Sequence, residues 1–210
     1  MRFFWLKFRL FLPSKLFGKE GFINFAKRQT SVKMYKSEIT SQIQMNVDEI
    51  VSTFEKTPDE LFFERFGEKW SIAENLQHLI LSAKPLFLAF SLPKFLPRLI
   101  FGKPNRPSRT FDEVVEKYHK KLEAGGVASA AYQPKIQTNA DKSQLIKNFR
   151  ATYSKFSQLF SENFSEHQLD NYLLPHPLLG KITVREMLYF TTYHIQHHHE
   201  TIQKNVKNLR

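Results

Sequence analysis

The chain has 210 residues, of which 41% are hydrophobic and 14% aromatic, enough apolar side chains for one globular domain with a substantial core. It has no cysteine, which excludes disulfides, thiolate metal sites and a cysteine nucleophile. The formal net charge of +11 makes nucleic acid and membranes candidate partners, so the distribution of this charge matters.

Most of the positive charge lies at the start of the chain. Residues 1–33 hold eight Lys or Arg against one glutamate, so this segment carries +7 and the rest of the chain only +4. Its apolar run is interrupted by Lys7 and Arg9 and falls short of the about 20 apolar residues of a membrane span. It also lacks the features of a secretory signal. It is either a basic, Phe-rich surface anchor or an upstream extension before a start at Met34. We favour the extension, with the domain over residues 34–210, because a regular helical pattern begins just after Met34.

The first predicted elements are helices. Apolar residues recur at three- and four-residue steps over residues 35–55, which predicts an amphipathic helix. A second helix begins within WSIAENLQHLILSAKPLFLAF, where Ser71 and Glu74 form a capping box. After an irregular stretch that contains four prolines, Thr110 and Glu113 cap a shorter helix that ends at two glycines.

The remaining elements complete an all-α pattern. A long helix covers about residues 141–164, and Thr183 and Glu186 cap the last helix. No alternating strand pattern is bounded by hairpin turns, so we predict no sheet. Four long helices and one short helix indicate a four-helix bundle. The long connection between the second and third long helices suits a crossover, because short loops force antiparallel neighbours.

The last helix carries four histidines within six residues, in TTYHIQHHHETIQK. Its apolar residues mark a buried stripe around Thr191, and at about 100° per residue His198 falls within about 20° of Thr191. His194 lies near the edge of the same face. The two imidazoles stand at i, i+4, which is the spacing of two ligands on one ion. His197 and His199 project to either side of this face.

The second helix offers a third imidazole. Apolar residues cover most of its circumference and leave a narrow polar strip, which such a buried helix directs towards a polar cavity. This strip consists of Ser71, Glu74, Asn75, His78 and Ser82. We therefore predict His78 as the third ligand. From spacing alone, a metal site and hydrogen-bonded core histidines both stay open, because H-x-x-x-H is a weak signal. The zincin class is excluded, since Ile195 stands where its glutamate base would be.

The two segments WSIAENLQHL and HPLLGKITVREMLYFTTYHIQHHHETI together resemble the DinB/YfiT-like family of metalloenzymes. The resemblance covers about residues 35–204 and implies a four-helix bundle in up-down-down-up order. It places one metal histidine in W-S-x-x-E-x-x-x-H-L, which matches His78, and two in H-x-x-x-H, which match His194 and His198. With the stripe argument, it predicts one divalent metal on these three histidines.

The resemblance also implies a function. Three neutral imidazoles leave coordination positions for water or substrate, and Zn, Ni, Mn and Fe(II) all suit such a site. Family members with assigned activity include S-transferases and isomerases that use low-molecular-weight thiols such as bacillithiol or mycothiol. The leading hypothesis is therefore transfer of such a thiol to an electrophile. Metal-dependent hydrolysis is a second hypothesis, and a non-catalytic stress protein stapled by metal is a third.

Supporting residues are weaker candidates. Glu74 could orient His78 or act as an acid or base, but its capping role already explains it. His176, between two prolines, could reach the mouth of the pocket, although an exposed loop histidine is the simpler interpretation. Tyr193 and His197 either border the site or lie at a helix interface.

The expected partner is a small-molecule substrate in a cytoplasmic protein, with a homodimer left open. No DNA- or RNA-binding motif is recognisable, so no sequence-specific nucleic-acid binding is expected.

Overall fold

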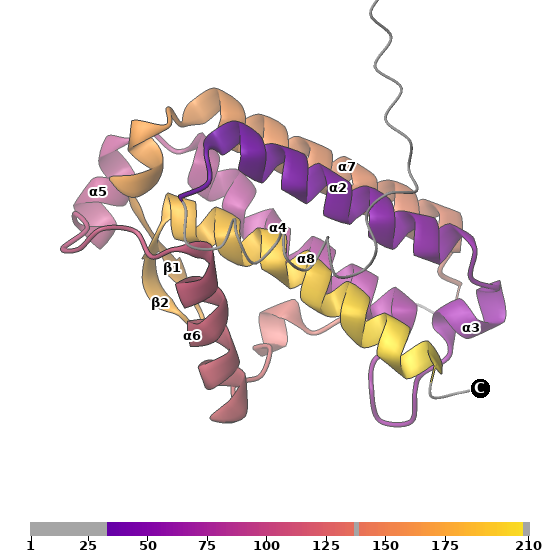
Figure 1. Ribbon diagram of the computed structural model, residues 1–210. Helices are drawn as coiled ribbons and strands as arrows, with labels where there is room; N and C mark the ends of the chain where they lie inside the picture. The colour runs from indigo at the N-terminus through magenta and orange to yellow at the C-terminus, as the bar shows by residue number, and fades with distance from the viewer. Residues whose placement is uncertain (1–32, 137–138, 208–210) are drawn as a thin grey trace, which may run out of the picture.

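Four long helices lie side by side in the computed structural model, which describes residues 33–136 and 139–207 (Figure 1). They are α2 (Lys36–Glu55), α4 (Ile72–Ser91), α7 (Lys142–Asn163) and α8 (Val184–Lys207). The four-helix bundle predicted from the sequence is therefore confirmed. The predicted extension over residues 1–33 lies, apart from Lys33, outside the described part of the chain.

The helix directions follow from contacts at their ends. At the start of α2, Lys36 Nζ donates to the carbonyl of Phe164, just beyond the end of α7, at 2.9 Å, so these helices are antiparallel. The carbonyl of Met34, just before α2, accepts from Arg185 in the first turn of α8 at 2.6 Å, so α2 and α8 are parallel.

The direction of α4 completes the order. Tyr153 of α7 donates to the carbonyl of Leu79 of α4 at 3.2 Å, and the rings of Phe90 and Phe160 lie 6.3 Å apart further along both helices. The helices α4 and α7 therefore run in the same direction. Together with the contacts of α2, this gives the up-down-down-up order.

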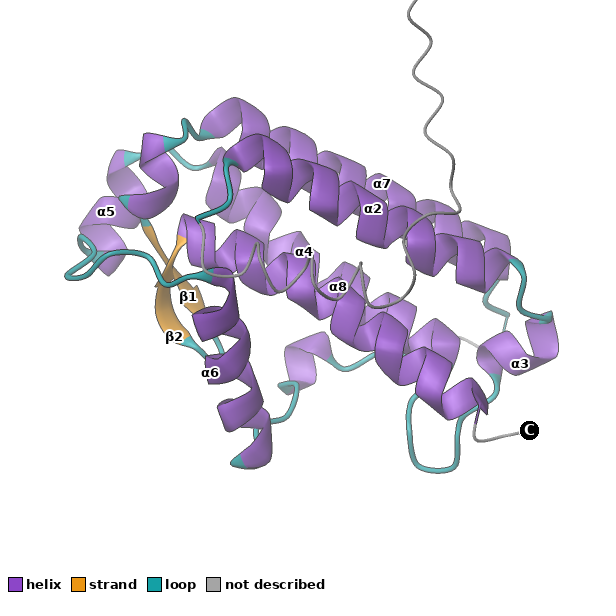
Figure 2. Ribbon diagram, viewed as in Figure 1, coloured by secondary structure: helices purple, strands orange, loops and turns teal. Residues whose placement is uncertain are grey.

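Two parallel neighbours require a long connection, and residues 92–141 supply it. This crossover carries α5 (Phe95–Phe101), the predicted short helix α6 (Phe111–Glu123) and a 3-10 turn η1 (Ala130–Tyr132) (Figure 2). A further short helix, α3 (Asp59–Phe63), joins α2 to α4. Within residues 33–136 and 139–207, no single helix is long and apolar enough to cross a membrane; α4 and α5 meet that test only as a pair bent by 112°.

The all-α fold contains one small sheet for which the sequence showed no strand pattern. After a 3-10 turn η2 (His167–Asp170), strands β1 (Leu173–His176) and β2 (Gly180–Thr183) form a small antiparallel hairpin that leads into α8. Leu174 pairs with Ile182, and both are buried. The hairpin escaped detection because each strand has four residues and the prolines in and after β1 hide any alternation.

Capping interactions fix where the helices begin. Ser71 Oγ accepts from the N–H of Glu74 at 3.0 Å while the Glu74 carboxylate accepts from the N–H of Ser71 at 2.7 Å. The Thr183 and Glu186 pair does the same at the start of α8. Each cap contributes about 1 kcal/mol. The caps thereby set the register in which α4 and α8 present their histidines to each other.

Candidate metal centre

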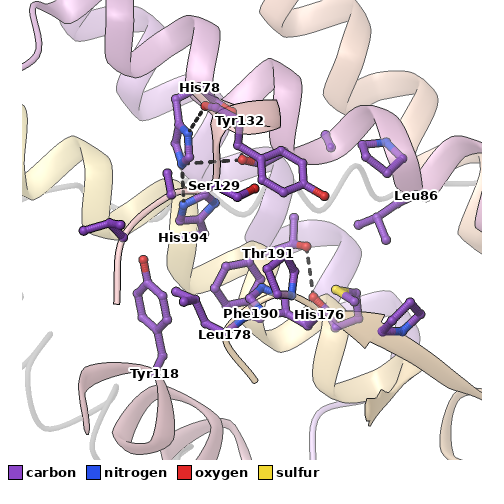
Figure 3. Close-up of a pocket in the computed structure, with 18 of the residues that line it drawn as sticks. His78, Leu86, Tyr118, Ser129, Tyr132, His176, Leu178, Phe190, Thr191 and His194 are labelled. Atoms are coloured by element: carbon purple, nitrogen blue, oxygen red, sulfur yellow. Dashed lines mark hydrogen bonds between the residues drawn. The ribbon is translucent and has the colours of Figure 1, made fainter. Parts of the chain in front are cut away.

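The three predicted metal ligands come together between α4 and α8. His78 Nε2 lies 3.2 Å from His194 Nε2, and His198 Nε2 lies 3.1 Å from the same atom. All three side chains are buried, and one nitrogen of each lies within 4.8 Å of the others. Figure 3 shows His78 and His194 facing each other at one wall of a cavity.

His78 is oriented by a backbone carbonyl. Its Nδ1 lies 2.7 Å from the carbonyl oxygen of Tyr132, in the η1 turn of the crossover. A carbonyl oxygen only accepts, so His78 Nδ1 carries the proton. In the neutral ring, Nε2 then presents a bare lone pair to the other histidines.

His198 is oriented in the same way by a side chain. Its Nδ1 lies 2.7 Å from Oδ1 of Asn75, one turn before His78 on α4. The Asn75 amide nitrogen donates to the carbonyl of Ser71 at 2.8 Å, which fixes the amide with its oxygen towards His198. His198 Nε2 is therefore also left with a bare lone pair.

Aromatic rings pack around the three imidazoles. Phe190, one turn before His194 on α8, stacks on the His194 ring at 4.9 Å between centroids. Trp70, just before α4, lies 4.9 Å from the His78 ring and stacks nearly parallel to His198. These contacts restrict the rotation of the rings and keep bulk water away from the nitrogens.

The surroundings keep the imidazoles neutral. Burial lowers the pKa of His194 and His198 well below 6.5, and neighbouring imidazoles lower both further. Burial also lowers the pKa of His78, although its hydrogen bond to the Tyr132 carbonyl works in the opposite direction. Neutral imidazole is the form that ligates a metal.

The donor set fits a divalent transition metal. With Nδ1 protonated in neutral His78 and His198, the Nε2 atoms of both rings can only accept a hydrogen bond. A proton on His194 Nε2 can be donated well to only one of them, so the other Nε2–Nε2 contact would lack a proton. A cation would satisfy all three lone pairs. Metal–nitrogen bonds of about 2.0–2.1 Å in a tetrahedral site put nitrogens about 3.3 Å apart, close to the 3.1 and 3.2 Å found here.

Comparison with known proteins shows the family and the fold of this chain. Residues 40–202 match the model of the DinB superfamily. The chain belongs to the DinB superfamily. No curated protein sequence matches it. Among solved structures, YfiT from Bacillus subtilis is similar with a TM-score of 0.54 and 15% identity, over 95% of this chain and 93% of that chain. YfiT is described as a probable metal-dependent hydrolase with an unusual four-helix bundle topology.

The other two histidines of α8, His197 and His199, lie outside the cluster of three metal-ligand candidates. His199 is buried against α2, where its Nε2 lies 2.9 Å from Thr53 Oγ1. The same nitrogen lies 3.0 Å from the side chain of Gln203, one turn further along α8. His197 is half-buried, with its ring beside those of Tyr118 and His119 of α6. Tyr193 donates or accepts a 2.6 Å hydrogen bond with His119, so it also belongs to the α6–α8 contact.

A cavity of about 130 Å³ adjoins the cluster, with His78 and His194 in its wall. Its walls come from α4, α6, α7, α8, the hairpin and the crossover, and most of its lining is apolar (Figure 3). The apolar lining includes Leu86, Leu122, Leu178, Met187 and Phe190. Within the described part of the chain, no Asp, Glu, Lys or Arg lines this cavity. It therefore suits a small substrate with an uncharged, largely apolar body.

Glu74 is held away from the chemistry by its structural role. Its carboxylate accepts from the N–H of Ser71 at 2.7 Å and from Arg65 Nε at 3.0 Å, and Glu74 is not part of the cavity lining. These contacts satisfy the carboxylate, as the capping interpretation of the sequence expects.

His176 lies in the wall of the cavity and not on an exposed loop. The hairpin turns its ring onto Phe190, at 4.2 Å between centroids. The N–H groups of Leu178 and Leu179 both donate to His176 Nδ1 at 3.1 Å, so the proton of the neutral ring is on Nε2. Burial, assisted by the nearby charge of Lys117, lowers its pKa to about 4. His176 is therefore a neutral hydrogen-bond donor at pH 7.

Several residues that shape the site were not predicted as such. Asn75 was noted in the polar strip, but its partner was not visible in the sequence. Trp70 precedes the same helix without any signal that it packs on two histidines. Tyr132 acts through its carbonyl, which every residue has, so no residue type could have revealed it. Tyr118 of α6 lines the cavity. The sequence predicts its helix but does not show that this helix packs against α8.

Proposed function

We propose that this chain is a metal-dependent enzyme that transfers a low-molecular-weight thiol to a small, largely apolar electrophile. One observation carries the proposal: His78 Nε2 and His198 Nε2 lie 3.2 and 3.1 Å from His194 Nε2, beside an apolar cavity. The description of YfiT as a probable metal-dependent hydrolase supports the metal dependence.

In this proposal His78, His194 and His198 hold one divalent metal. A metal bound there would act as a Lewis acid and lower the pKa of a thiol or water next to it. The Tyr132 carbonyl and the Asn75 amide hold two of the rings in the ligating tautomer, as outer partners do in metal sites generally. Trp70 and Phe190 pack on the rings of His78 and His194 and restrict their rotation.

The lining of the cavity favours a thiol over water as the nucleophile. A thiol has a pKa of about 8.5, so a modest shift ionises it near neutral pH. Activating water in metallohydrolases commonly involves a carboxylate base, and no described Asp or Glu lines this cavity. Tyr118 cannot replace it, because burial raises its pKa to about 12.

His176 supplies the second polar function in this proposal. Its Nε2–H makes no hydrogen bond to another residue in the described ranges, and its ring is held by Phe190 and the hairpin. A donor fixed in this way can stabilise negative charge that develops on an electrophile's oxygen. With an epoxide, transfer forms a carbon–sulfur bond and breaks a carbon–oxygen bond, and the thiol proton ends on the released oxygen. With an unsaturated carbonyl, the carbon–carbon π bond breaks, the enolate oxygen carries the developing charge, and the proton ends on the α-carbon.

Hydrolysis is the second candidate, favoured by the description of YfiT. A metal staple without catalysis is less favoured, because structural zinc sites are closed by four protein ligands and three histidines form this cluster.

One assay separates these functions. Protein loaded with Zn, Ni, Mn or Fe(II) is incubated with low-molecular-weight thiols and small epoxides or unsaturated carbonyls, with aryl esters and amides in parallel. The proposal predicts a thioether product that requires thiol and metal and is lost in His78→Ala. Ester or amide cleavage without thiol dependence would establish the hydrolase instead, and a metal-loaded chain inactive on both would leave the staple.

A further inference from the structure

The short helix α5 turns its apolar side chains outward. Phe95, Leu99 and Ile100 are 66%, 79% and 59% exposed, whereas Pro97 is buried against the rest of the protein. At about 100° per residue, the three exposed side chains fall within an arc of about 140° on one face of the helix. A soluble domain normally turns such a face inward, so this arrangement marks a contact surface.

Cations fix α5 in this orientation. Lys94, just before the helix, places its Nζ 3.5 Å from the centre of the Phe164 ring, and Arg98 lies over Tyr172 at 5.6 Å. At the other end, Lys181 Nζ donates to the Phe101 carbonyl at 3.1 Å. Lys94 and Arg98 thus hold one side of α5 on the protein, while Arg98 and Lys103 stay exposed beside the helix. The apolar face of α5 is left without a partner among the described residues.

All charged residues in the chain around α5 are basic. Between Glu74 and Asp112 the sequence has no acidic residue but six Lys or Arg, of which three, Lys94, Arg98 and Lys103, are on α5 or within two residues of it. The nearby acids Glu166 and Asp170 are both bound to Arg185, at 2.6 and 2.7 Å. The exposed apolar face is therefore bordered by positive charge that local carboxylates do not neutralise.

We propose that α5 docks this domain on an anionic lipid surface. Apolar side chains surrounded by Lys and Arg match the boundary between acyl chains and anionic headgroups, where apolar burial and charge attraction act together. A second copy of the chain would bring the same positive charges face to face. Residues 1–33 carry +7, so they are an equally poor electrostatic match for this surface. The lipid surface is the occupant that complements both the apolar face and its charge.

The test uses the full chain and locates the contact. Trp5→Phe is made in every protein, so that Trp70 is the remaining native tryptophan. Leu99→Trp then places a reporter on α5, and Met45→Trp places one at a 55% exposed apolar position on α2 as the matched control. Vesicles contain phosphatidylcholine with or without phosphatidylglycerol, and their acyl chains are brominated to quench tryptophan within the bilayer.

The proposal predicts that vesicles with phosphatidylglycerol quench the fluorescence of the Leu99→Trp tryptophan and that neutral vesicles quench it weakly. For Met45→Trp, the vesicles should quench no more fluorescence than they do in the parent protein, which has only Trp70. Phe95→Ser with Ile100→Ser should lower vesicle binding at least about tenfold, because two large apolar side chains no longer enter the interface. Added salt should weaken binding.

Two results would overturn it. Vesicle binding without quenching of Leu99→Trp would show that another segment makes the contact. A double serine variant that binds vesicles normally but changes from dimer to monomer would identify a second copy as the occupant of this face. Unchanged thermal melting of the variants, measured first, removes misfolding as an explanation.

Discussion

Asn75 Oδ1 lies 2.7 Å from His198 Nδ1, and the two residues are 123 positions apart in the chain and belong to different helices. This contact ties the orientation of a candidate ligand on α8 to the first turn of α4. Because Asn75 is itself held by the carbonyl of Ser71, the capping of α4 and the geometry of the metal centre depend on each other.

Asn75→Ala should weaken metal binding without removing it. Loss of the carbonyl oxygen frees His198 to rotate and to place its proton on Nε2, and outer partners of metal histidines typically contribute about 10- to 100-fold in affinity. Competition with a chelator measures this change. Asn46→Ala is the matched control, since Asn46 is also buried and donates to the Thr192 carbonyl of α8 at 2.9 Å. Equal metal affinity in the two variants would contradict the role of Asn75.

His176→Phe should lower turnover while leaving the metal in place. The aromatic ring can still pack on Phe190, but the Nε2–H donor is gone, and removal of one such donor typically costs about 100-fold in kcat. His176→Asn is a second variant that keeps an acceptor for the N–H groups of Leu178 and Leu179. Steady-state kinetics and metal analysis of both variants provide the measurement. Full activity in both would show that His176 only closes the hairpin.

A chain that begins at Met34 should fold as a complete domain. The backbone N–H of Met34 donates to Tyr189 at 2.9 Å and its carbonyl accepts from Arg185, so Met34 itself anchors the entry to α2. The shortened protein should be soluble and melt in one cooperative transition close to that of the full chain. Aggregation or a broad transition would show that residues 1–33 are part of the domain.

Acid should remove the contribution of Asp170 to stability. Burial alone would raise its pKa, but hydrogen bonds from Arg185, Lys33 and Ser108 outweigh burial and lower it from 3.8 to about 2. A carboxyl with a lowered pKa stabilises the fold above the unfolded value and loses that effect as the pH falls from about 4 to 2. The contribution is about 1 kcal/mol after solvent screening.

Chemical denaturation of the wild type and Asp170→Asn at pH 7 and at pH 2.5 tests this linkage. The difference in free energy of unfolding between the two proteins should be clear at pH 7 and much smaller at pH 2.5. An equal difference at both values would mean that Asp170 acts through packing and not through its charge.

The sequence predicts elements and faces better than it predicts partners. Helix periods and capping pairs place α4 and α8 closely, and the apolar stripe selects His194 and His198 over His197 and His199 as neighbours of His78. The Tyr132 carbonyl was beyond reach, because a backbone atom in a long crossover has no residue-type signal. The hairpin that carries His176 was missed for a related reason, since four-residue strands interrupted by proline show no period.

The central claim is that His78, His194 and His198 bind one divalent metal and that the adjacent histidines do not. Elemental analysis of tag-free protein tests it most directly, with each histidine replaced by alanine in turn. The wild type should hold about one metal per chain, with sharp loss in His78→Ala, His194→Ala and His198→Ala and full retention in His197→Ala and His199→Ala. Full occupancy in His198→Ala, loss in His199→Ala, or a wild type that cannot be loaded with any divalent metal would contradict the account.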